Sequence, residues 1–242
     1  LGEGRIPSPI SNIRFVDDSE HVLYHSNLEE IEQFIKSGGR PPVFEKAGPR
    51  EKIFFDPSKL KCGIVTCGGI CPGLNDVIRA IVRALHFHYN AQTIFGFPFG
   101  YEGLSYKYGH ALLDLTPEVV DDIHQKGGSI LGSSRGPQDI SEMVDCLERM
   151  SIGLLFTIGG DGTLRGARAI AEEISNRNLK IGVIGIPKTI DNDISYVERS
   201  FGFMTAVSEA TNSIYAAHTE AEGARNGIGL VKLMGRESGF IA

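Results

Sequence analysis

The sequence lacks three features that would each have pointed to a class of protein. No apolar run in its 242 residues reaches the roughly 18 residues that a membrane-spanning helix needs, and its first ten residues, LGEGRIPSPI, lack the apolar core of a signal peptide. There is no excess of positive charge, because the formal net charge is −6, and this argues against nucleic-acid binding. We therefore expect a cytoplasmic protein that binds neither membranes nor nucleic acids. The chain does not begin with Met, which leaves its native start open.

Cysteine is also scarce, and three of the four residues, Cys62, Cys67 and Cys71, lie close together in the sequence. A metal site, or a disulfide between Cys67 and Cys71, is one interpretation. No histidine or fourth cysteine lies nearby at a spacing typical of zinc sites, and nothing in the sequence indicates secretion. We favour the alternative of small reduced thiols around a tight loop.

Residues 1–60 differ in composition from the rest of the chain, because they combine several prolines with mixed charge. One helix is predicted over residues 27–36, where Leu28, Ile31 and Ile35 share a face and a Ser-Gly-Gly run follows. We interpret this segment as an extension that packs on something else.

Short apolar strands alternate with amphipathic helices from residue 61 onward. Strands are expected at residues 62–66, 93–97, 153–158, 180–186 and 227–234, and helices at 74–87, from Pro117, at 164–174 and at 202–218. The alternation predicts a doubly wound, mainly parallel α/β sheet of the Rossmann-like kind, covered by helices on both faces. Ligands of such sheets bind beyond the carboxyl ends of the strands.

Two glycine-rich loops follow predicted strands and open predicted helices. The first reads TCGGICPGLN at residues 66–75, and the second reads GGDGT at residues 159–163. Glycine lets the backbone turn with positive φ and approach a ligand, and the N-terminus of the following helix offers free N–H groups to an anion. The pattern favours phosphate binding, although a plain tight turn between strand and helix would also explain the first loop.

The acid in the second loop, Asp161, adds a requirement for a cation. A carboxylate beside a phosphate repels it unless a cation lies between them, and Mg²⁺ bound through one carboxylate and phosphate oxygens meets this need. The alternative is that Asp161 caps the helix, which would not require the surrounding glycines.

A third loop, PKTIDND at residues 187–193, holds two carboxylates and a lysine at the end of a predicted strand. Turn chemistry accounts for its Asn and Asp residues but not for Lys188 and Thr189. The set fits the positioning of a nucleophilic hydroxyl and the neutralisation of a moving phosphoryl group. A fourth segment, residues 127–137, offers small hydroxyls and Arg135, whose guanidinium suits phosphate recognition, although a lone arginine on a loop is more often a surface residue.

These loops belong to a larger set of motifs that resembles the phosphofructokinase family over about residues 61–242. The motifs are CGGICPGLN, GYEGL, GGSILGSSRG, GGDGT, PKTIDND and MGRESG, in the order and spacing of that family. GGDGT alone is also similar to the motif of NAD kinases and of diacylglycerol or sphingosine kinases, which do not follow it with PKTIDND. The resemblance implies a glycolytic 6-phosphofructokinase that transfers a phosphoryl group from ATP to the 1-hydroxyl of fructose 6-phosphate, with Mg²⁺.

The resemblance also implies roles for individual residues. Asp191 resembles the base that takes the proton from the sugar hydroxyl, with Thr189 and Lys188 beside it in the catalytic set, and Asp161 resembles the acid that binds the metal. The nucleotide is expected at Gly69, Tyr101, Arg135, Gly136, Gly160, Asp161, Gly162, Thr163 and Gly166. Fructose 6-phosphate is expected at Thr189, Asp191, Asp193, Met234, Gly235 and Arg236.

The phosphoryl donor is indicated by two positions. Lys188 resembles the pyrophosphate-using branch, but that branch has an Asp where this chain has Gly162. Gly162 together with Lys188, and the long N-terminal extension, resemble ATP-using enzymes of the plant and trypanosome type. Pyrophosphate as donor, and an inactive or regulatory nucleotide-binding subunit, are the alternatives; the presence of both Asp161 and Asp191 argues against the inactive subunit.

Other features of the resemblance concern assembly and regulation. We expect a homo-oligomer, either a dimer or a tetramer. Gly227 stands where the bacterial enzymes place an arginine that reaches into a neighbouring subunit, and whether the nearby Arg225 replaces it is left open. Arg79 and Arg83 resemble two arginines of the bacterial effector site, with a solvated helix face as the alternative.

The resemblance divides the chain into an N-terminal extension at 1–60, a nucleotide-binding domain at 61–202, and the opening helix and strand of a second α/β domain, for the sugar phosphate, at 203–242. Family members continue well beyond this point, so we expect the sequence to be a fragment. Apolar faces such as those of Met204, Val207 and Ile214 would then be uncovered, and residues 1–242 alone are expected to aggregate and to be inactive.

Overall fold

The computed structural model describes residues 1–24, 27–235 and 237–242, and the chain divides into two compact units, Leu1–Pro57 and Ser58–Ala242. The boundary falls where the proline-rich composition ends. Among the described residues, no helix is both long and apolar enough to cross a membrane.

The first unit consists of two small antiparallel strand pairs and one helix. Strand β1 (Ile6–Pro7) pairs with β4 (Lys52–Ile53), β2 (His21–Leu23) pairs with β3 (Val43–Glu45), and α1 spans Leu28–Lys36. The predicted helix at 27–36 is confirmed by α1. The side chain of Asn27 caps the start of this helix by accepting a hydrogen bond from the backbone N–H of Glu29 at 2.9 Å. None of the described apolar side chains of this unit is buried, so the unit has no core of its own.

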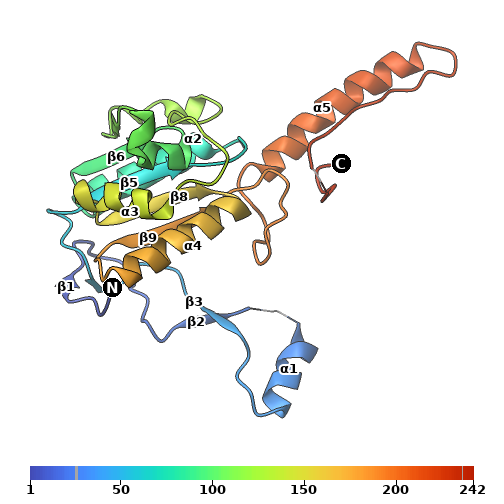
Figure 1. Cartoon of the computed structure of the whole chain (residues 1–242). Coiled ribbons are helices and arrows are strands. Elements are labelled where there is room, and N and C mark those ends of the chain that lie inside the picture. Colours follow the sequence, from blue (N-terminus) through green and yellow to red (C-terminus); the bar gives the residue numbers. More distant parts are fainter. Residues whose placement is uncertain (25–26, 236) are drawn as a thin grey trace. The chain divides into compact units, whose positions relative to one another are not determined.

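The second unit is built on one five-stranded sheet, shown in Figure 1. Its strands, in spatial order, are β7 (Leu113–Asp114), β6 (Thr93–Phe97), β5 (Lys61–Thr66), β8 (Leu154–Gly159) and β9 (Gly182–Pro187). All pairs are parallel except β6 with β7, which is antiparallel. The mainly parallel α/β sheet predicted from the sequence is confirmed.

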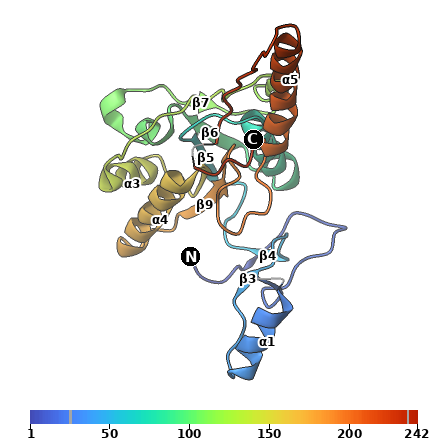
Figure 2. The ribbon, with the colours of Figure 1, turned by 90° about the vertical axis from the view of Figure 1, so that its right-hand side faces the viewer.

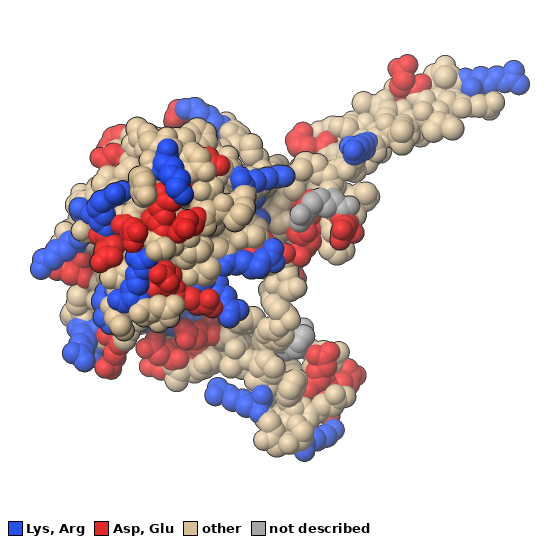
Figure 3. All heavy atoms as spheres, in the orientation of Figure 1, with Lys and Arg blue, Asp and Glu red and all other residues tan. Residues whose placement is uncertain are grey.

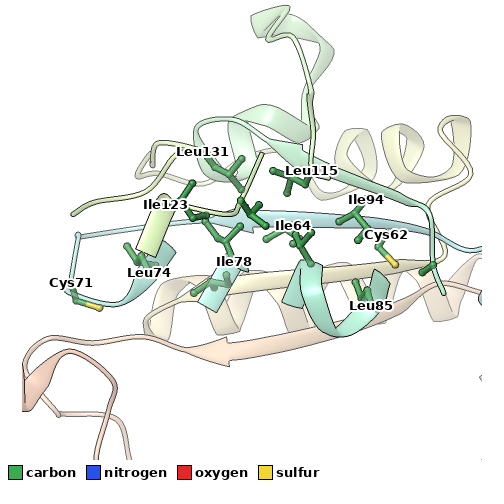
Figure 4. Close-up of a cluster of buried hydrophobic side chains, with 14 residues drawn as sticks. Cys62, Ile64, Cys71, Leu74, Ile78, Leu85, Ile94, Leu115, Ile123 and Leu131 are labelled. Carbon is green, nitrogen blue, oxygen red and sulfur yellow. The ribbon is translucent and has the colours of Figure 1, made fainter. Parts of the chain in front are cut away.

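Two clusters of buried side chains, one on each face of the sheet, form the core of this unit. Helix α2 (Leu74–Arg83) packs on one face, where Ile64 of β5 meets Ile78 of the helix, as Figure 4 shows. Helices α3 (Ile140–Arg149) and α4 (Asp161–Asn176) lie next to each other on the other face (Figure 2). Their buried side chains form a cluster with Val65 of β5. Successive side chains of a strand point to opposite faces, so the continuous apolar run of β5 supplies both layers.

Several predicted elements have different bounds. The helix expected at 74–87 is α2 followed by a single π-helical segment, Ala84–His88, and the helices expected at 164–174 and 202–218 are the longer α4 and α5 (Phe203–Glu222). Helix α3 and the edge strand β7 were not predicted.

The helix predicted to start at Pro117 is wrong. Turns occupy this stretch, followed by one short 3₁₀ segment, Ile123–Gln125. Only Val120 and Ile123 reach the core here, and turns suffice to bury them. The adjacent Asp121 and Asp122 have low helix propensity, so nothing favours further helix.

The strand predicted at 227–234 is also wrong, because these residues form no strand in the structure. They lie along α5 instead, with Gly229 so close to the helix that a Cβ there would be 2.7 Å from the carbonyl oxygen of Ala217. Ile228 and Leu230 are 90% and 92% exposed, and no residue of α5 is buried. Met204 and Ile214 of α5 are 51% and 45% exposed and Val207 is half-buried, so apolar side chains of this helix are uncovered as expected. Figure 3 shows few charged side chains along α5.

A buried acid ties the segment between β6 and β7 to helix α3. The Glu142 side chain is 9% exposed, accepts a hydrogen bond from the Ser105 hydroxyl at 2.8 Å and pairs with the Lys107 ammonium at 2.6 Å. The hydrogen bond from Lys107 is the main reason that the pKa of Glu142 lies below its ordinary value. The carboxylate therefore stabilises the fold in its ionised form.

We predict that Glu142→Gln lowers the melting temperature at pH 7, and that the difference from the unchanged protein shrinks as the solution becomes acidic. A carboxyl whose folded pKa is depressed contributes its full stability above its unfolded pKa of about 4.3, and this contribution is lost as the pH falls through the lower folded pKa. Thermal unfolding between pH 7 and pH 3 measures the effect. Glu148→Gln, at an exposed position of the same helix, is the control. A deficit in Glu142→Gln that does not change with pH would contradict the assignment.

Candidate functional site

A cavity of about 1210 Å³ lies at the edge of the sheet where β5, β8 and β9 end. The chain places β6 on one side of β5 and then crosses to β8 on the other side, so the loops after β5 and β8 diverge at this point. All but one of the predicted site residues line the cavity: Gly69, Tyr101, Arg135, Gly136, Gly160, Asp161, Gly162, Thr163, Gly166, Lys188, Thr189, Asp191, Asp193, Met234 and Gly235. The remaining one, Arg236, lies outside the described residues.

The first glycine loop is fastened to the segment that carries Arg135. Gly68 has φ +82°, in the left-handed region that favours glycine, and its backbone N–H donates to the Ser134 carbonyl at 3.1 Å. The Ser133 hydroxyl in turn donates to the Gly68 carbonyl at 2.6 Å. These bonds bring the guanidinium of Arg135 beside Gly69, where an added Cβ would lie 3.5 Å from its Nη2 atom.

The second glycine loop starts helix α4. Gly160 occupies the N-cap position without a side-chain hydrogen bond, and Asp161 is the first helical residue. The interpretation of Asp161 as the cap is therefore wrong, and its exposed carboxylate lines the cavity instead. Gly159 is required by packing, because a Cβ there would lie 2.1 Å from the Thr163 hydroxyl, whereas a Cβ on Gly162 would meet nothing within 4 Å.

Tyr101 is locked against the start of α4. Its hydroxyl donates to the Thr163 carbonyl at 2.6 Å, and its ring lies where a Cβ on Gly166 would be, 2.6 Å from that position. Burial raises the pKa of Tyr101, so the phenol remains a neutral donor. Tyr101 thus fixes one wall of the cavity as well as lining it.

The loop after β9 is held by its own side chains. The Thr189 hydroxyl donates to the Asp193 carboxylate at 2.6 Å and accepts from the backbone N–H of Asp191 at 3.1 Å. Thr189 and Asp191 are buried, at 8% and 6% exposure. The structure therefore presents Asp191 from a fixed, largely dry position.

Lys188 joins this loop to the first one. Its side chain is buried, and its ammonium donates to the Gly69 carbonyl. Burial lowers the pKa of Lys188, and the nearby positive charge of Arg135 acts in the same direction, while Asp191 opposes it. The positive charge of Lys188 thus lies directly behind the first glycine loop.

Several residues that line the cavity were not predicted from the sequence, among them Gln138, Arg165 and Lys232. Arg165 lies one helical turn after Asp161, so the i, i+4 spacing could have indicated it. Lys232 gave no such signal, because it lies in the stretch predicted as a strand.

The four cysteines, and Arg79 and Arg83 of helix α2, do not contribute charge to the cavity. All four cysteines are free and buried, and burial raises the pKa of the cavity-lining Cys67 to about 11, which leaves its thiol unreactive. Across the described residues, no group of three or more His, Cys, Asp or Glu could hold a metal ion by itself.

The Arg79 guanidinium donates to the Asp121 carbonyl at 3.0 Å, and Arg83 lies 3.7 Å from the Asp121 carboxylate.

A family model described as phosphofructokinase matches residues 61–242. The chain belongs to the phosphofructokinase family. It is 51% identical over 246 residues to a protein of Borreliella burgdorferi named ATP-dependent 6-phosphofructokinase, a match that covers 100% of this chain and 55% of that protein. It is 52% identical over 238 residues to ATP-dependent 6-phosphofructokinase 7 of Arabidopsis thaliana, with 98% and 48% covered. This phosphofructokinase chain spans about half the length of the curated relatives it matches.

The similarity extends to a trypanosome relative and to solved structures. The Trypanosoma cruzi ATP-dependent 6-phosphofructokinase is 51% identical over 229 residues, covering 94% of this chain and 47% of that protein. The pyrophosphate-dependent phosphofructokinase of Marinobacter aquaeolei matches with a TM-score of 0.60 at 20% identity, covering 67% of this chain and 42% of that one, and supports the fold alone. The resemblance to plant and trypanosome members stated from the motifs is confirmed.

Two glycines of α4 offer a matched test of the Tyr101 contact. We predict that Gly166→Ala destabilises the protein by about 1–3 kcal/mol, because its methyl group would overlap the fixed tyrosine ring. Gly162→Ala, where the space is open, should instead stabilise it by roughly 0.5 kcal/mol through better helix propensity. Chemical denaturation of both variants measures the difference. Equal effects at the two positions would show that the ring of Tyr101 is free to move.

Proposed function

We propose that the enzyme containing this sequence is an ATP-dependent 6-phosphofructokinase, which transfers the γ-phosphoryl group of ATP to the 1-hydroxyl of fructose 6-phosphate. The observation that carries the proposal is the meeting of Asp161, Asp191 and two glycine-rich loops in one cavity at the strand ends. The names of relatives that share about 50% sequence identity with this chain support the same conclusion.

Asp191 is proposed to start the reaction. Its carboxylate would take the proton from the sugar 1-hydroxyl as that oxygen forms a bond to the γ-phosphorus, while the bond from this phosphorus to the leaving ADP breaks. Burial of Asp191, and the hydrogen bond from its backbone N–H to the Thr189 hydroxyl, fix the position of the residue for this step. Phosphoryl transfer needs little covalent help, so positioning and charge neutralisation account for most of the catalysis.

The residues at the start of α4 are proposed to hold Mg²⁺ and the nucleotide. Asp161 is the acid at the start of α4 that faces the cavity, and magnesium is commonly bound through one or two carboxylates together with substrate phosphates, so the donor set fits. The metal would supply neutralisation of the developing phosphate charge. The N–H groups of the first helical turn and of Gly69, with Arg135, would contact phosphate oxygens.

Lys188 is proposed to stabilise the bound phosphate with its positive charge. Its ammonium already donates to the Gly69 carbonyl, so it orients that peptide while its charge favours an anion on the cavity side. The sugar phosphate is proposed to lie near Asp193, Met234 and Gly235, which line the same cavity.

Pyrophosphate is the second candidate donor, and the observation that favours it is Lys188 at this position. The open space at Gly162 favours ATP, because it leaves room for the α-phosphate and the nucleoside attached to it. A homo-oligomer stays a prediction. So does a cytoplasmic location, since one relative is named as a chloroplastic enzyme.

We predict that Asp191→Asn lowers kcat by about 10²–10⁴, the range typical of losing a general base, while the KM for fructose 6-phosphate changes much less. The substitution keeps the shape of the side chain and removes its basicity. Coupled assays of fructose 1,6-bisphosphate formation, with ATP and with pyrophosphate as donors, measure the effect and identify the donor. Activity within a few-fold of the unchanged enzyme would rule out Asp191 as the base.

We predict that Gly162→Asp weakens the use of ATP, on the order of 1000-fold in kcat/KM, because a carboxylate close to a phosphate costs about 4 kcal/mol at the dielectric of a protein surface. Gly162→Asn, of nearly the same size but neutral, is the matched control and should lose much less. Use of pyrophosphate, if present, should be spared. An unchanged kcat/KM for ATP would place the α-phosphate elsewhere.

A further inference from the structure

Asn192 lies next to the proposed base, but it does not line the cavity. Its backbone has φ +53°, in the left-handed region that asparagine tolerates better than most residues. Its side-chain amide is bonded at both ends, because the oxygen accepts from the backbone N–H of Ser200 at 2.7 Å and the nitrogen donates to the Glu198 carbonyl at 3.1 Å. The amide therefore joins two stretches of chain.

Ser200 completes a closed arrangement around the base. It is buried, at 4% exposure, and its hydroxyl donates to the Thr189 carbonyl at 2.6 Å. Thr189 precedes Asp191 and Asn192 follows it, so Ser200 holds the loop on both sides of the carboxylate. A hydroxyl and an amide that are hydrogen-bonded to the backbone in this way have little freedom to move.

The residues after Ser200 are packed on the first glycine loop. Gly202 has φ +82°, and a Cβ there would lie 2.3 Å from the Pro72 carbonyl oxygen. The ring of Phe201 lies 3.3 Å from the position of a Cβ on Gly73. Residues 200–202 are thus held both by the loop that carries the base and by the loop that approaches the proposed phosphate site.

We propose that Asn192 and Ser200 are positioning residues, which set the distance between the Asp191 carboxylate and the glycine loop at residues 68–73. The inference rests on the proposed function, since it assigns a purpose to the position of the base. A displacement of about 1 Å in a reacting group can cost about 10²-fold in rate, so a clamp of this kind acts on kcat without touching substrate.

Asn192→Gly separates this role from that of a simple turn residue. Glycine adopts positive φ freely, so a residue needed only for the turn would be replaced without loss. A residue needed for its amide would not be. Ser200→Ala removes the other half of the clamp, and Asn178→Gly is the matched control, because Asn178 is exposed, has φ +55° and lies just beyond the end of α4 opposite to Asp161.

The experiment measures kcat, both KM values and the stoichiometry of ATP binding for these variants in the enzyme containing this sequence. We expect Asn192→Gly and Ser200→Ala each to lower kcat by about 10- to 100-fold, with full ATP-binding stoichiometry and a KM for ATP within about twofold. The double variant should be little worse than either single one, because the two residues act as a unit. Asn178→Gly should match the unchanged enzyme.

Three results would overturn the inference. Asn192→Gly at full activity, beside an active unchanged enzyme, would reduce Asn192 to a turn residue and leave the proposed function intact. A loss of activity matched by a loss of ATP-binding stoichiometry would indicate ordinary destabilisation. An unchanged enzyme inactive with both donors would remove the proposed function and the clamp with it. If Asn192→Gly does not fold, Ser200→Ala, which removes the other half of the clamp without adding charge, provides the same test.

Discussion

The parallel pairing of β5 with β8, and of β8 with β9, is the constraint on which the rest of this phosphofructokinase unit depends. Parallel strands end at the same edge of a sheet, so three chemically distinct loops leave the core within reach of one another. The ladder continues past the strands, where the backbone N–H of Cys67 donates to Ile158 and that of Lys188 donates to Gly159, each at 2.9 Å. The cavity is therefore a consequence of strand direction before any side chain is considered.

Glycine makes this convergence possible at short range. Side chains at Gly159, Gly166 or Gly202 would overlap the Thr163 hydroxyl, the Tyr101 ring or the Pro72 carbonyl, respectively. These glycines serve packing between the loops, whereas Gly162 and Gly136 have open space around them and leave room in the cavity. The same residue type thus has two different purposes within one site.

The positive and negative groups of the site differ in how deeply they are buried. Lys188 is buried and tied to a carbonyl, whereas Asp161 is exposed at a helix start where the backbone dipole favours a negative charge. Figure 3 shows acidic and basic side chains interspersed over the face it presents, in keeping with the net charge of −6. An anionic ligand in the cavity would meet the positive charges of Lys188 and Arg135, which line it.

Local patterns in the sequence were enough to predict the parallel α/β sheet, the three loops at its edge and the residue types available there, because strand and helix periodicities and glycine runs are properties of neighbouring residues. These patterns failed at Pro117 and at residues 227–234, because whether a helix or strand forms depends on what lies beside it. After Pro117, turns are enough to bury Val120 and Ile123. At residues 227–234, Ile228 has no neighbouring strand among the described residues to supply hydrogen bonds. The bond from the Lys188 ammonium to Gly69, and the closing of Ser200 around Asp191, came from the tertiary structure alone. Those contacts join segments distant in sequence, so the direction of each side chain is set by packing that no local pattern records.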